Sequence, residues 1–300
     1  HLDYHRDMES YFRAKSALFD NLGPKAVAVV NVDDPYGRRL ASACRNASDQ
    51  AGRRLITFGA GGEATLRATR IDTGDKGCHV TLETDEGAVE LESPLMGRIN
   101  AENMMAAAGA ARAMGIAWKT IARGVASVPA VPGRLEPVTV PAVPGRNPQD
   151  FRVFVDYAHT DDALRKLLQT VREITTGRVI VVFGCGGDRD RTKRPLMGAH
   201  AEELADVVYL TSDNSRGERP ESIIGEILAG MKHSTPGGGR VHVETDRRKA
   251  IEQAITTARA GDVVVIAGKG HETYQITGDG ITRFDDRVAA REVLERTLGS

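Results

Sequence analysis

The chain of 300 residues carries 40 Lys and Arg against 41 Asp and Glu, which gives a formal net charge of −1 at pH 7. Because these charges are spread along the chain, we expect neither nucleic acid nor an anionic membrane as the main partner. The hydrophobic content of 41% is typical of a soluble globular protein, no apolar run is long enough to span a membrane, and the three separated cysteines indicate reduced thiols in a cytoplasmic protein.

In the first part of the chain, the hydrophobic pattern predicts a mixture of helices and strands. In chain order the expected elements are a helix over 5–22, a strand over 25–32, a helix opening at Asp34-Pro35, a strand over 54–58, short strands over 66–71, 79–84 and 88–91, and helices over 101–115 and 118–128. Turn residues between the three short strands indicate that these strands pair in antiparallel orientation. The segment Pro129-Ala-Val-Pro-Gly133 then predicts a boundary between domains over 1–131 and 132–300.

From residue 132 onward, strands and helices alternate. The expected strands are 151–155, 178–183, 206–210, 240–243 and 262–267, and the expected helices are 161–174, 195–204, 220–231, 247–260 and 286–297. This alternation predicts an α/β fold with a doubly wound parallel sheet. We expect residues 275–277 and 281–284 to form a hairpin at the edge of that sheet.

Two polar clusters directly follow buried strands of this second domain. They are Thr211-Ser-Asp-Asn-Ser-Arg216 and Gly268-Lys-Gly-His-Glu272. Ligands bind outside the carboxyl ends of strands in open α/β sheets, and the carboxylates, amide and guanidinium suit a small zwitterion. The alternative is that Asp213, Asn214 and Ser215 cap the next helix and that Arg216 is merely solvated. Two clusters at two strand ends favour a ligand site.

A third segment, Gly184-Cys-Gly-Gly-Asp-Arg-Asp190, is a glycine-rich turn that could present backbone N–H groups to an anion. It is neither a Walker A loop nor a dinucleotide fingerprint, and no GxxxxGK[ST] occurs in the chain. By itself such a turn is more often a tight connection than a site.

Further polar segments give the chain a specific order of motifs. Ahead of the two clusters come His1-Leu-Asp-Tyr-His5 with Lys15, Met96-Gly-Arg-Ile-Asn-Ala-Glu-Asn103, Gly133-Arg-Leu-Glu136, Asp156-Tyr-Ala-His-Thr160, and Gly186-Gly-Asp-Arg-Asp190 with Lys193-Arg-Pro195. In content and order this series resembles the Mur ligases. The resemblance implies part of a central ATPase domain, lacking its Walker A loop, followed by a Rossmann-like C-terminal amino-acid-binding domain. The family's N-terminal UDP-binding domain has no counterpart, so we expect this chain alone to be inactive.

The resemblance implies an ATP-dependent amide ligase of peptidoglycan synthesis, and hence of cell shape and division. ATP would phosphorylate a D-glutamate carboxylate of a UDP-N-acetylmuramoyl dipeptide, and an amine of meso-diaminopimelate would attack the acyl phosphate, with Mg²⁺ and fixed cations stabilising the charge. The implied roles are His1 as a metal ligand, Lys15 as a carbamylated catalytic lysine, Asn103 on the adenine side, Arg134 at the ATP phosphates, Asp156 at the ribose, and His159 beside the nucleotide. All of these but His159 have a plainer alternative: an ordinary terminal histidine, a solvated Lys15 or Arg134, an amide that caps a helix or lies between helices, or an N-cap at Asp156.

For the amino-acid site, the resemblance implies recognition of meso-diaminopimelate by Arg189 and the segment 213–216. Diaminopimelate has a second carboxylate that lysine lacks, and Arg216 can hold it bidentately. Glu272, with the backbone at Gly268, would hold the far amine. Two departures from the family pattern are Ser215 and Asp161, both in place of proline. Ser215 leaves the turn less restricted than proline would.

Three alternatives stay open. The chain could be a non-catalytic Rossmann-like module that binds an amino acid or a nucleotide, the lysine-adding ligase of the same family, or a relative that ligates glutamate to folate or another amine to muramyl peptides. Arg216 speaks against the last two. We expect a monomer.

Overall fold

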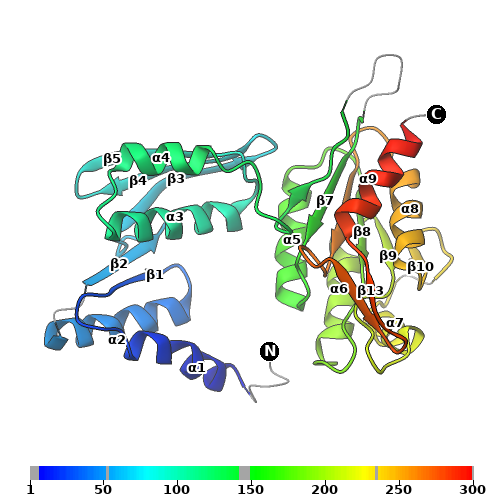
Figure 1. The fold of residues 1–300 in the computed structure, drawn as a ribbon, viewed down its shortest axis with the longest axis horizontal. Helices are drawn as coiled ribbons and strands as arrows, with labels where there is room; N and C mark the ends of the chain where they lie inside the picture. The colour runs from blue at the N-terminus through cyan, green and yellow to red at the C-terminus, as the bar shows by residue number, and fades with distance from the viewer. Residues whose placement is uncertain (1–6, 52–53, 142–148, 234–235, 299–300) are drawn as a thin grey trace. The chain divides into compact units, whose positions relative to one another are not determined.

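The computed structural model describes residues 7–51, 54–141, 149–233 and 236–298. The chain divides into two compact units, His1–Pro129 and Ala130–Ser300, each with its own sheet and hydrophobic core (Figure 1). Within the described residues, no helix combines the length and apolarity that crossing a membrane would require.

The first unit is built around a five-stranded sheet of order β1-β2-β3-β4-β5. Its strands are β1 (Val27–Asn31), β2 (Arg54–Gly59), β3 (Leu66–Gly74), β4 (Gly77–Thr84) and β5 (Gly87–Ser93), and its helices are α1 (Met8–Asp20), α2 (Pro35–Ala51), α3 (Arg98–Ala113) and α4 (Trp118–Ala126). The first three strands are parallel, whereas β4 is antiparallel to both of its neighbours, β3 and β5. The predicted antiparallel pairing of the three short strands is therefore confirmed.

The two faces of this sheet are covered by different helices. Gly109 of α3 packs so closely that an added Cβ would lie 2.9 Å from Cγ1 of Val29 on β1. The next residue along the strand, Val30, points the other way and packs with Ala41 of α2. Alternation along β1 thus places α3 and α2 on opposite faces.

The second unit contains a six-stranded sheet of order β10-β9-β8-β11-β7-β6. Its strands are β6 (Glu136–Pro137), β7 (Arg152–Asp156), β8 (Val179–Phe183), β9 (Val207–Leu210), β10 (Val241–Val243) and β11 (Val263–Ala267), and its helices are α5 (Asp161–Glu173), α6 (Lys193–Leu204), α7 (Pro220–Leu228), α8 (Arg247–Thr257) and α9 (Asp286–Thr297). All neighbouring pairs are parallel except β6 with β7. Helices α5, α6 and α7 pack in sequence as one layer, and α8 and α9 form the other.

The predicted doubly wound α/β sheet is therefore confirmed, but the predicted place of the hairpin is wrong. Strands β12 (Tyr274–Thr277) and β13 (Gly280–Arg283) pair with each other in a separate two-stranded sheet. The reason is that β11, which precedes the hairpin, lies between β8 and β7 in the sheet interior, so the chain leaving it is not at an edge. The edge next to β7 is taken by the short antiparallel β6, which the sequence did not indicate.

Candidate functional site

The carboxyl ends of β7, β8, β11 and β9 lie along one edge of the second unit's sheet, because these strands are parallel neighbours. The chain reaches β8 and β9 through the α5–α7 layer but enters β11 from α8 on the opposite face. Ligands of open α/β sheets bind where the connections change sides in this way. The loops after these four strands therefore form the candidate site.

The two polar clusters identified in the sequence meet at this edge. Asn214 Nδ2 donates to Glu272 Oε2 at 2.9 Å, and the ammonium of Lys269 donates to Asn214 Oδ1 at 3.1 Å. The backbone N–H of Ile276 also donates to Asn214 Oδ1, at 2.9 Å. The amide of Asn214 thus ties the loop after β9 to the loop after β11.

Asp213 and Gly268 are in direct contact within the same site. Gly268 has φ +115°, and a Cβ added there would lie 2.6 Å from Asp213 Oδ2. The carboxylate of Asp213 is buried, and its Oδ1 accepts the N–H of Asn214 at 2.6 Å. Only glycine allows this approach and this backbone conformation.

Arg216 and Arg189 both lie beside the glycine-rich turn after β8. A Cβ added at Gly186 would be 3.1 Å from Arg216 Nη1 and 3.7 Å from Arg189 Cγ. Nη1 of Arg216 donates to the carbonyls of Gly187 and Asn214 at 3.0 and 3.2 Å, while Arg189 is exposed. Two guanidinium-bearing side chains therefore flank one glycine, an arrangement suited to a carboxylate.

The helix-capping alternative for this segment is wrong. Helix α7 begins at Pro220 with Arg219 as its N-cap, four residues or more beyond the proposed capping residues 213–215. Ser215 is buried, and its carbonyl accepts the N–H of Glu218 at 3.0 Å, which closes a turn. Arg216 has φ +50°, a left-handed conformation that is uncommon for a residue with a side chain.

A second group of predicted residues follows β7. Asp156 accepts the N–H groups of Leu135 and Ala158 at 2.8 and 2.7 Å. Burial raises the pKa of the Asp156 carboxyl, and these two N–H groups and the charge of Arg134 oppose that shift. The N-cap of α5 is Thr160, so the capping alternative for Asp156 is wrong.

His159 and Arg134 lie beside one aromatic ring, that of Tyr157. The His159 ring centroid is 4.6 Å from that of Tyr157, and the exposed Arg134 guanidinium lies 5.3 Å from it. His159 Nδ1–H donates to the Tyr157 carbonyl at 2.8 Å. Burial lowers the pKa of His159, which favours the neutral imidazole.

Tyr157 connects this second group to the two polar clusters. Burial raises the pKa of its phenol, and the nearby carboxylates of Glu272 and Asp213 raise it further. Its backbone N–H donates to the Gly133 carbonyl at 2.8 Å, and a Cβ at Gly270 would lie 2.6 Å from the Tyr157 Cβ. Tyr157 was not predicted as a site residue, although it stands inside the motif Asp156-Tyr-Ala-His-Thr160.

The site residues that were predicted in the first unit lie on two of its helices. Lys15 is exposed on α1 with its ammonium 5.4 Å from the Tyr11 ring centroid, and Asn103 is exposed on α3. His1 lies outside the described residues. Among the described residues, no group of three or more His, Cys, Asp or Glu side chains could hold a metal ion.

The burial of three charged residues around the site was not predicted from the sequence. Arg194, Arg247 and Lys269 all have fully buried side chains. Arg194 donates to Glu218 through both terminal nitrogens, at 2.9 and 2.8 Å, and to the Gly186 carbonyl at 3.2 Å. The signal that could have found them is their position just after a loop or a strand end. Hydrophobic periodicity does not reveal which charged side chains are buried.

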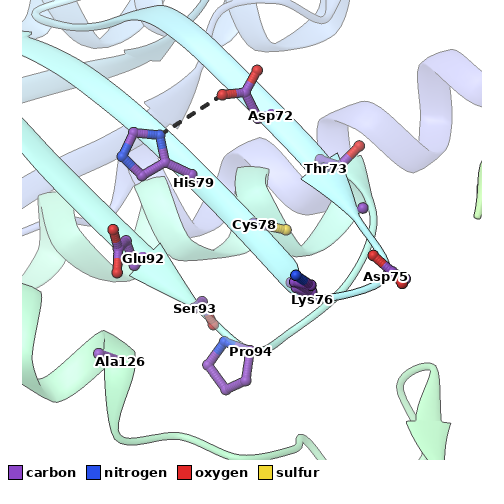
Figure 2. A pocket seen from close by; sticks show the side chains of 12 residues that line it. Asp72, Thr73, Asp75, Lys76, Cys78, His79, Glu92, Ser93, Pro94 and Ala126 are labelled. Atoms are coloured by element: carbon purple, nitrogen blue, oxygen red, sulfur yellow. Dashed lines mark ion pairs between the residues drawn. The ribbon is translucent and has the colours of Figure 1, made fainter.

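A separate hollow of about 470 Å³ lies in the first unit, at the turn between β3 and β4 (Figure 2). His79 lines it, with Nδ1 3.9 Å from Asp72 Oδ2 and Nε2 2.9 Å from Glu90 Oε2. None of the residues predicted for the site lines this hollow.

Comparison with known proteins gives matches over most of the chain. The Mur ligase middle domain matches residues 1–111, and the Mur ligase glutamate ligase domain matches residues 133–270. UDP-N-acetylmuramoyl-L-alanyl-D-glutamate–2,6-diaminopimelate ligases from Gloeobacter violaceus and Solibacter usitatus are 48% and 47% identical, over 99% and 98% of this chain. The chain spans 57% of the length of each of these relatives. A solved structure of a ligase of the same name is 37% identical, with a TM-score of 0.62, covering 99% of this chain and 58% of that one.

Proposed function

Because the chain belongs to the Mur ligase family, we propose that the whole protein is an ATP-dependent amide ligase of peptidoglycan synthesis. It adds meso-diaminopimelate to UDP-N-acetylmuramoyl-L-alanyl-D-glutamate. The second unit of this chain supplies the site for diaminopimelate, and the loop after β7 supplies part of the site for ATP.

The observation that carries the proposal is the meeting of the two polar clusters. Asn214 contacts Glu272 at 2.9 Å, and Arg216 lies beside the same turn as Arg189. One end of the site therefore offers a carboxylate and the other offers guanidinium groups. A ligand with an amine and a carboxylate on one carbon, like the far end of diaminopimelate, matches both.

In the proposed reaction, a D-glutamate carboxylate oxygen attacks the γ-phosphorus of ATP, and ADP leaves. The near amine of diaminopimelate then attacks the carbonyl carbon of the acyl phosphate, loses a proton, and displaces inorganic phosphate. The protein's part is mainly to hold the amine in line with the carbonyl. Arg216, Arg189 and Glu272 do this by fixing the far end of the amino acid.

For the nucleotide, Arg134 and His159 face Tyr157, and Asp156 follows β7. We assign Arg134 to the phosphates, Asp156 to the ribose and His159 to the neighbourhood of the nucleotide, with Asn103 on the adenine side. Mg²⁺ would screen the transferring phosphate. The described residues do not by themselves assemble a metal site, so its ligation by His1 and support by carbamylated Lys15 stay predictions.

The test is a reconstitution of the reaction with the full-length protein. Phosphate release should require ATP, the UDP-sugar dipeptide and meso-diaminopimelate together, and mass spectrometry should find the UDP-sugar tripeptide. Release without an amino acid, or release with lysine equal to that with diaminopimelate, would contradict the proposal. Binding of amino acid or nucleotide with no turnover would instead identify a non-catalytic module.

A further inference from the structure

Lys269 places a fully buried ammonium group inside the candidate amino-acid site. It stands in the loop after β11, and its side chain has an exposed fraction of 0%. Nζ donates to Asn214 Oδ1 at 3.1 Å and to Glu272 Oε2 at 3.0 Å, and it lies 5.7 Å from the Tyr274 ring centroid. A lysine is almost never buried to this extent unless it is paired.

The two carboxylate oxygens of Glu272 differ in their hydrogen bonds. Oε2 accepts from Lys269 and also from Asn214 Nδ2, at 3.0 and 2.9 Å. Both contacts that the described residues make to this carboxylate therefore fall on one oxygen. The Glu272 side chain retains an exposed fraction of 18%, and neither of these hydrogen bonds involves Oε1.

We propose that Lys269 is a positioning residue, which orients Glu272 so that Oε1 receives the far ammonium group of the acceptor amino acid. This rests on the proposed function. Lys269 holds the carboxylate through Oε2. Its hydrogen bond to Asn214 Oδ1 also holds the loop after β9. Lys269 itself does not touch the acceptor.

Two effects of the Lys269 charge oppose each other. Its positive charge repels the ligand's ammonium group, but the Glu272 carboxylate stands between the two cations and accepts from both. Without Lys269 the partly buried carboxylate loses its charged partner and its fixed orientation. A hydrogen bond to a charged group contributes roughly 10- to 100-fold in an equilibrium constant, so we expect loss of orientation to outweigh loss of repulsion.

The test compares two acceptors in the full-length enzyme. meso-Diaminopimelate carries the far amine, whereas L-2-aminopimelate keeps both carboxylates but lacks that amine. The ratio of kcat/KM for the two acceptors measures the contact between Glu272 and the far amine. In Lys269→Met this ratio should fall by about tenfold or more, while the KM for ATP stays the same.

Two controls separate positioning from a general structural defect. Lys249→Met removes an exposed lysine of α8 and should leave the ratio unchanged. In a Glu272→Gln background, Lys269→Met should produce little further fall, because coupled residues are not additive. Lys269→Gln serves as the second variant if the methionine variant does not fold.

An equal loss of activity with both acceptors, an unchanged ratio, or a higher ratio in Lys269→Met would overturn the proposal. These outcomes differ from a failure of the proposed function, in which the wild-type protein would show no diaminopimelate-dependent turnover at all. In that case the positioning role of Lys269 would be rejected together with the proposed function.

Discussion

Arg247 and Asp286 form a bidentate ion pair in which both side chains are fully buried. Nε and Nη2 of Arg247 each lie 2.7 Å from a carboxylate oxygen of Asp286. Arg247 also donates to the carbonyls of Ser212 and Ala267, at 3.2 and 3.0 Å. These carbonyls immediately precede Asp213 and Gly268, so the pair holds the starting points of both clusters.

Arg247→Met should strongly destabilise the second unit. It leaves the Asp286 carboxylate buried without its partner, which costs about 3–5 kcal/mol. Hydrogen exchange of the amides in β9 and β11 should become faster. The control is Arg248→Met, whose pair with Glu292 is half exposed and contributes roughly 0–1 kcal/mol. Equal exchange in the two variants would show that the buried pair is not a major support.

Gly268→Ala should weaken diaminopimelate binding. The new methyl group would lie 2.6 Å from Asp213 Oδ2, so the carboxylate must move. Gly280→Ala is a matched control, because Gly280 has φ +122° but nothing within 4 Å of an added Cβ. Both variants carry backbone strain of about 1–3 kcal/mol, and only the first disturbs the site. Calorimetric titration of the full-length variants should show weaker binding in Gly268→Ala alone.

Arg216→Ala should weaken diaminopimelate binding far more than nucleotide binding. Arg216 is half-buried, and loss of a charge-assisted contact that the bound ligand covers costs about 2–5 kcal/mol. Arg219→Ala removes a nearby arginine that is 84% exposed, and it should change neither affinity. Calorimetric binding of diaminopimelate and of a nucleotide analogue gives the comparison. Equal losses for both ligands would contradict the placement of Arg216.

In the full-length enzyme, meso-diaminopimelate should be preferred over L-lysine by several orders of magnitude. Lysine would leave Arg216 and Arg189 without a carboxylate, and a site built for a polar group rejects the analogue lacking it by roughly 10⁴-fold or more. Ser215, in place of proline, could lower this ratio by loosening the turn. The measurement is the ratio of kcat/KM for the two amino acids, and a ratio near one would exclude residues 213–216 as a specificity element.

The ion pair of Arg194 with Glu218 should make stability depend on pH in the acid range. The Arg194 guanidinium, which donates to Glu218, lowers the pKa of that carboxyl from 4.5 to about 2. The stabilisation is present above pH 4.5 and is lost as the pH falls from there towards about 2. The difference in unfolding free energy between wild type and Glu218→Gln should therefore shrink across this range.

The sequence by itself determined the main helices and strands, although not the short β6, and the place of the polar clusters along them. Apolar runs such as those ending at Leu210 and Ala267 are local, and their alternation with helical periods requires a parallel sheet. Parallel strands in turn require that the residues after them lie at one edge. For that reason Asp213, Asn214 and Gly268 could be assigned to one site before any contact was known.

Only the tertiary structure decided which loops touch and which charges are buried. The insertion of β11 between β8 and β7 brings Glu272 to Asn214, a contact between residues 58 apart in the sequence, and moves the hairpin away from the sheet edge. Nothing in the sequence indicates that Arg247 and Lys269 are buried. Their partners Asp286 and Asn214 lie 39 and 55 residues away, and local periodicity carries no information about pairing over such distances.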